Sequence, residues 1–84
     1  MITLPSSPLI IPVGNRKDKE QDYPMVVVLN TAAGEIAFSG DDGLSYFVPV
    51  YDLSAANQLI THAQMPITHI RLTGTAGVDK YAIR

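Results

Sequence analysis

The chain contains no cysteine, so disulfide bonds and cysteine-rich zinc sites are excluded. Its 84 residues suffice for one domain, which we predict to span the whole of 1–84. A domain of this length buries only about 60% of the surface that its unfolded chain exposes. Small domains often depend on disulfides, metals or self-association for stability. Without disulfides, stability here must come from an efficient core or from an oligomer.

Charged side chains are also scarce, at 17% of the residues against about 25% in typical globular domains. They are unevenly distributed, and one short stretch holds Arg16, Lys17, Asp18, Lys19, Glu20 and Asp22. We predict that residues 14–22 form a solvated, charged loop. The remaining surface must be largely neutral, either because small polar residues cover it or because a partner covers an apolar patch.

The sequence lacks three further signals. It has no positive excess, since its net charge is −2, whereas nucleic-acid binders usually carry a clear excess of Lys and Arg. It has no basic, apolar leader of the secretory type. Its longest apolar run, residues 25–29, is far too short to cross a membrane. We therefore predict a cytoplasmic protein without membrane contact.

Several stretches have the composition of β-strands. Residues 1–8 are rich in Pro and Ser, and we expect an extended N-terminal arm. Residues 9–13 could form a strand at a sheet edge, because Pro8 and Pro12 have no N–H to donate to a neighbouring strand. The β-branched run 25–29 is typical of a central strand that is buried on both faces.

A hairpin is predicted around residues 40–43, where Asp-Gly separates two alternating runs. The first run is 35–39 and the second is 44–51, in which Pro49 indicates an edge or the end of pairing. In an extended second run, one face would carry Leu44, Tyr46, Val48 and Val50.

A helix is predicted over residues 53–64, with Asp52 as its N-cap. Apolar residues follow a helical spacing at Leu53, Ala56, Leu59, Ile60 and Ala63. Strands are expected again at 67–73 and 78–83. The predicted fold is α+β, in the order β-β-β-β-α-β-β, with the helix on one face of a mostly antiparallel sheet of four to six strands.

No motif indicates catalysis, so we predict a protein that is not an enzyme and has no cofactor, metal or catalytic residue. His62 and His69 could approach each other at the end of the predicted helix, but a metal site needs three or four ligands. Asp41 and Asp42 fit a hairpin turn better than a calcium loop or a catalytic pair. The glycine-rich stretch 74–77 lacks the Lys and the following helix of a phosphate loop.

The low charge and the single predicted helix leave one sheet face or edge uncovered. We therefore predict a non-catalytic accessory or regulatory protein that binds another protein through a sheet surface, most simply a second copy in a homodimer. The predicted interface residues are Val26, Val28, Phe47 and Tyr51.

The alternative is a small nucleic-acid-binding module. Single-stranded nucleic acids bind to sheets that expose aromatic side chains beside Lys or Arg. The last two predicted strands offer Arg71, Lys80, Tyr81 and Arg84.

Overall fold

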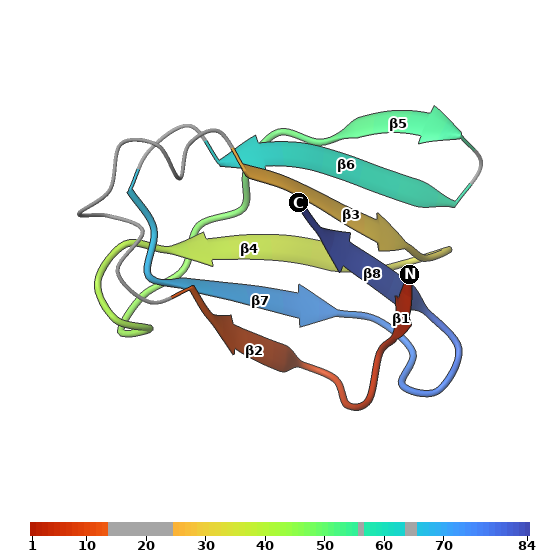
Figure 1. Cartoon of the computed structure of the whole chain (residues 1–84), viewed down its shortest axis with the longest axis horizontal. Coiled ribbons are helices and arrows are strands. Elements are labelled where there is room, and N and C mark those ends of the chain that lie inside the picture. Colours follow the sequence, from red (N-terminus) through yellow and green to blue (C-terminus); the bar gives the residue numbers. More distant parts are fainter. Residues whose placement is uncertain (14–24, 56, 64–65) are drawn as a thin grey trace.

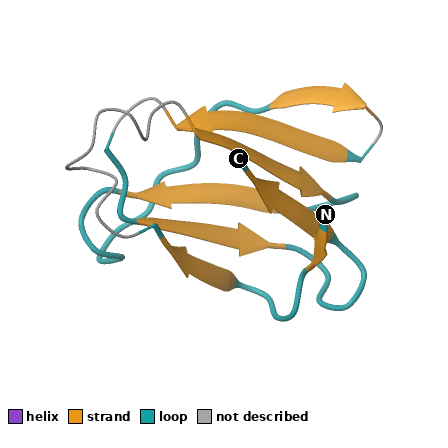
Figure 2. Cartoon of the chain, in the orientation of Figure 1, coloured by secondary structure: helices purple, strands orange, loops and turns teal. Residues whose placement is uncertain are grey.

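The protein is an all-β sandwich of two antiparallel sheets (Figures 1 and 2). The computed structural model describes residues 1–13, 25–55, 57–63 and 66–84. The larger sheet has five strands in the order β1-β8-β3-β6-β5, and the smaller has three in the order β2-β7-β4. In chain order the strands are β1 (Ile2–Thr3), β2 (Leu9–Pro12), β3 (Met25–Asn30), β4 (Glu35–Ser39), β5 (Asp52–Ala55), β6 (Gln58–Ala63), β7 (His69–Thr73) and β8 (Lys80–Ile83).

The predicted α+β class is wrong, because the described residues of the expected helix form a β-hairpin instead. β5 and β6 pair antiparallel with a bulge, and β6 pairs with the whole of β3. Asn57, between them, has a φ of 62°, in the left-handed region that suits a turn and not a helix interior. In the described residues the chain has strands and no helix, and thus none long and apolar enough to cross a membrane.

The helical spacing misleads because two residues of the predicted stripe, Leu59 and Ala63, also lie on one face of a strand. In β6, Thr61 and Ala63 are buried, whereas His62 between them is exposed. Pairing with β3 brings Thr61 opposite Val27 and His62 opposite Val26, so the hairpin covers one edge of the most apolar strand. A strand at this position satisfies backbone groups of β3 that a helix would leave unpaired. The long-range pairing therefore overrides the local pattern.

The prediction of a central, buried strand at 25–29 is confirmed by β3. It lies between β8 and β6 in the middle of the larger sheet. Val27 and Leu29 are fully buried and point into the sandwich, and Val28 on the outer face is also buried. The core between the sheets contains Leu4, Val27, Leu29, Ile36, Phe38, Ala63, Ile67, Ile70 and Leu72.

The two sides of the sandwich are closed by segments that cross from one sheet to the other (Figure 1). On one side, residues 4–8 connect β1 to β2, and Leu4 is part of the core. On the other side, residues 40–51 connect β4 to β5. The strand predicted at 44–51 is not continuous there, since its one bridge to β4 joins Phe47 to Phe38. The predicted charged loop at 14–22 lies outside the described residues.

The predicted edge position of residues 9–13 is confirmed, because β2 is the outer strand of the smaller sheet. The N–H of Val13 donates to the carbonyl of Thr68 at 2.9 Å, so alternate residues of β2 face β7. The outer edge of the sheet therefore presents the backbone groups of Pro8, Ile10 and Pro12. Since the prolines have no N–H, Ile10 offers the one free donor of this edge within the described stretch 8–13.

Candidate functional site

The two most exposed large apolar side chains of the described residues, Leu44 and Val50, lie in the crossing between β4 and β5. We define the apolar segment as Leu44, Phe47, Val48 and Val50. Leu44 is 87% exposed, Val50 is 89% exposed and Phe47 is 43% exposed. No charged residue occurs from position 43 to position 51. An uncharged run of exposed apolar side chains is typical of a binding surface.

A hydrogen-bonded turn centred on Asp41 positions the start of the apolar segment. The Asp41 carboxylate accepts bonds from the Ser45 hydroxyl, from the Ser45 N–H at 2.9 Å and from the Ser39 hydroxyl at 2.7 Å. These bonds, above all that of the Ser45 hydroxyl, lower the pKa of Asp41 to about 2. Asp42 and Gly43 have φ values of 61° and 86°, which reverse the chain after β4. Asp41 thus organises the turn.

The far end of the apolar segment is fixed to the free edge of β4. The backbones of Phe38 and Phe47 exchange two hydrogen bonds, of 2.8 and 2.9 Å, and the two rings contact edge to face. The Tyr51 hydroxyl accepts from the Ile36 N–H at 2.7 Å and donates to the Ile36 carbonyl. Burial raises the pKa of Tyr51, so the hydroxyl keeps the proton that it donates. The outward-facing backbone groups of β4 are therefore satisfied within the chain.

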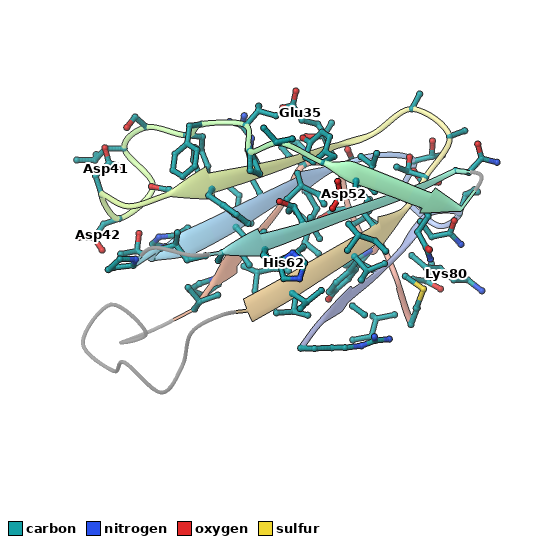
Figure 3. The ribbon with its side chains drawn as sticks, turned by 90° about the horizontal axis from the view of Figure 1, so that it is seen from above. Glu35, Asp41, Asp42, Asp52, His62 and Lys80 are labelled. Carbon is teal, nitrogen blue, oxygen red and sulfur yellow. The ribbon has the colours of Figure 1, made fainter. Side chains whose placement is uncertain are left out.

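A shallow pocket of about 320 Å³ lies beside the apolar segment, lined by Pro49, Val50, Asp52, Thr61 and His62. Figure 3 shows Asp52 and His62 on the neighbouring strands β5 and β6. The Thr61 hydroxyl donates to the Val50 carbonyl at 2.9 Å, so it serves the backbone. One carboxylate and one imidazole are too few to hold a metal, and the described residues contain no group of three or more candidate ligands.

The predicted interface residues lie on two different surfaces. Val26 and Val28 are on the outer face of the larger sheet, where Val28 is only 6% exposed. Phe47 belongs to the apolar segment at the edge of β4. Tyr51 packs against the core with its ring and caps the β4 edge with its hydroxyl. The structure therefore does not bring the four residues into one patch.

The predicted nucleic-acid residues are also separated. Arg71 lies on the smaller sheet, where it stacks on the Tyr46 ring at 4.5 Å and approaches Glu35 at 3.7 Å. Lys80 and Arg84 are exposed on the outer face of the larger sheet. Tyr81 points the other way and packs against the core. No shared basic and aromatic surface results from these four residues.

The two histidines are separated as well. His62 projects from the larger sheet, since its neighbours Thr61 and Ala63 are the buried residues of β6. His69 belongs to the smaller sheet, where Ile70 and Leu72 point into the core. Its ring contacts the Thr68 hydroxyl at 3.0 Å. A metal site shared by the two histidines would require a different fold.

The exposure of Leu44, Val48 and Val50 was not predicted from the sequence. Their shared face in an extended run was visible, but an apolar face in a strand normally belongs to the core. The absence of charge from 43 to 51, between Asp42 and Asp52, is the signal that could have identified them.

Comparisons with known proteins add no relative, since no protein-family model, curated protein or solved structure matches this chain.

Proposed function

We propose that the protein is a non-catalytic binding protein that contacts other copies of its own chain through the apolar segment. The observation that carries this proposal is the exposure of Leu44 and Val50, 87% and 89%, in a run of nine residues without a charge. Monomeric proteins rarely expose large contiguous apolar patches unless a ligand or partner covers them.

The order of the apolar segment supports a binding role over a merely solvated loop. The Asp41 turn fixes one end, and Phe47 and Tyr51 fix the other to β4. A surface that is ordered before binding loses less conformational entropy when the partner arrives.

The sheet edges favour contact through side chains over pairing of strands. Prolines occupy the outer edge of β2, and Phe47 and Tyr51 cap the edge of β4. In the larger sheet, β1 has two residues and β5 has four with a register shift. Short, bulged or capped edges are the devices by which β-proteins avoid edge-to-edge association.

The proposal is tested by the solution mass of the whole chain over a dilution series, measured by sedimentation velocity. We expect concentration-dependent association in the wild type and its loss in the double variant Val48→Ser/Val50→Ser. The control is Ile10→Ser, which removes a half-exposed apolar side chain from a different surface. A wild-type mass of one chain at all concentrations, or equal weakening by both variants, would contradict the proposal.

A further inference from the structure

A symmetric dimer through the apolar segment would bring like charges together. Asp42 and Asp52 border the segment at its two ends, and neither carboxylate has an ion-pair partner among the described residues. In a two-fold contact the segment faces itself, so these carboxylates of one copy approach those of the other. Like charges at a contact reduce affinity, because their repulsion must be overcome together with their desolvation.

A second surface of the same chain carries the opposite charge. We define the β8 face as Val26, Val28, Lys80, Ala82 and Arg84, on the outer side of the larger sheet. The register places Ala82 beside Val28, and the Arg84 and Val26 backbones exchange hydrogen bonds of 2.9 and 3.1 Å. Small apolar side chains thus form a floor between two exposed cations, Lys80 and Arg84.

The cations of the β8 face are available for a partner. The one ion pair among the described residues joins Arg71 to Glu35, on the smaller sheet. Lys80 and Arg84 take part in no ion pair within those residues. Figure 3 places Asp41 and Asp42 toward one end of the molecule and Lys80 toward the other, so these opposite charges do not neutralise each other within one copy.

We propose that copies of the chain associate head to tail, with the apolar segment of one copy on the β8 face of the next. Leu44, Val48 and Val50 cover the apolar floor, and Asp42 and Asp52 approach the cations of the neighbour. Such a contact joins two different surfaces, so it leaves one of each free and can add further copies. This inference rests on the proposed function and specifies the geometry of the association. It also assigns Val26 and Val28 to one side of the contact and Phe47 to the other.

The test mixes two variants that each lack one surface. Val48→Ser/Val50→Ser removes two of the four apolar side chains of the apolar segment and leaves the β8 face intact. Lys80→Glu/Arg84→Glu removes both cations of the β8 face and leaves the apolar segment intact. Each variant alone is expected to remain a monomer, whereas an equimolar mixture should form a two-chain complex and grow no further. Thermal melts of both variants check that they fold, and Lys80→Gln/Arg84→Gln repeats the test without reversed charge.

The wild type supplies the second measurement by sedimentation velocity. Its mass should rise beyond two chains with concentration, and its dissociation constant should rise with salt by roughly two- to fivefold for each ion pair that is screened. A mass that stops at two chains, with no complex in the mixture, would overturn the head-to-tail geometry while the proposed self-association stands. A wild-type monomer at every concentration would overturn both and would leave a different protein as the occupant of the apolar segment.

Discussion

The two segments that close the sides of the sandwich use their apolar residues in opposite ways. At the crossing from β1 to β2, Leu4 is 0% exposed, its N–H donates to Asp79 at 2.7 Å, and its carbonyl accepts from Gly77 at 2.8 Å. At the crossing from β4 to β5, Leu44 is almost fully exposed. Both segments close a side of the sandwich, but only the first places its leucine in the core. The second segment therefore has apolar side chains that the fold does not require.

The largest expected effect contrasts the two leucines directly. Leu4→Ala should lower the free energy of unfolding by about 2–5 kcal/mol, because it leaves a cavity in the core. Leu44→Ala should lower it by less than about 0.5 kcal/mol, as for other exposed positions. Urea denaturation at a concentration where the chain is monomeric measures both. If Leu4→Ala and Leu44→Ala lose similar amounts of unfolding free energy, the two crossings do not differ in how they use their leucines.

The second prediction concerns the buried bonds that hold the first crossing. The Thr31 hydroxyl donates to the Asp79 carboxylate at 2.7 Å, and the same oxygen accepts from the Thr75 N–H at 2.7 Å. This oxygen lies 2.5 Å from where a Cβ on Gly74 would stand, so a side chain there would displace the carboxylate from its two donors. Thr31→Val should lower the free energy of unfolding by about 2 kcal/mol, since a buried carboxylate loses a donor.

The matched control for that change is Thr75→Val. Thr75 is exposed and offers its backbone N–H, which the substitution retains. Both variants are compared by urea denaturation. If Thr75→Val destabilises the chain as much as Thr31→Val, the loss does not come from the bond between Thr31 and Asp79.

The third prediction concerns the anchor of the second crossing. Tyr51→Phe removes the hydroxyl that forms hydrogen bonds with both backbone groups of Ile36. The free energy of unfolding should therefore fall by about 1 kcal/mol. The Ile36 amide should then exchange its hydrogen roughly fivefold faster. Tyr46→Phe is the control, because its hydroxyl makes no hydrogen bond among the described residues. Unchanged exchange at Ile36 in Tyr51→Phe would show that the hydroxyl does not protect this edge.

Local sequence patterns predict some strands of this fold and mislead at others. The β-branched run of β3 and the alternation of β4 identify these strands because their neighbours agree with their local pattern. The β5–β6 hairpin also matches a helical pattern, because Leu59 and Ala63 fit both spacings, and only the pairing with β3 decides between them. That pairing joins residues 28 to 38 positions apart, from Asn30 with Gln58 to Met25 with Ala63, and no local pattern contains it.

The candidate site was predictable only in part, for the same reason. Alternation predicts one face for Leu44, Val48 and Val50 in an extended run, but the exposure of these side chains depends on the absence of a covering element. The bond from Tyr51 to Ile36 holds this segment on β4 across 15 positions of sequence. Its neighbours in sequence do not indicate such a contact, whereas the Asp-Gly turn was visible because its geometry is local.

The smallest expected effect tests the turn at which the second crossing begins. The Ser45 hydroxyl is the main cause of the low Asp41 pKa, so Ser45→Ala should raise that pKa from about 2 toward the ordinary 3.8. Carboxyl NMR signals followed through an acid titration measure it directly, with Ser6→Ala as a control at an exposed serine outside the turn. Because folding lowers this pKa, its contribution to stability is present above pH 3.8 and is lost as the pH falls through 2. A wild-type Asp41 that titrates near 3.8 would mean that the turn does not hold the carboxylate, and the apolar segment would then lose the ordered start on which its binding role depends.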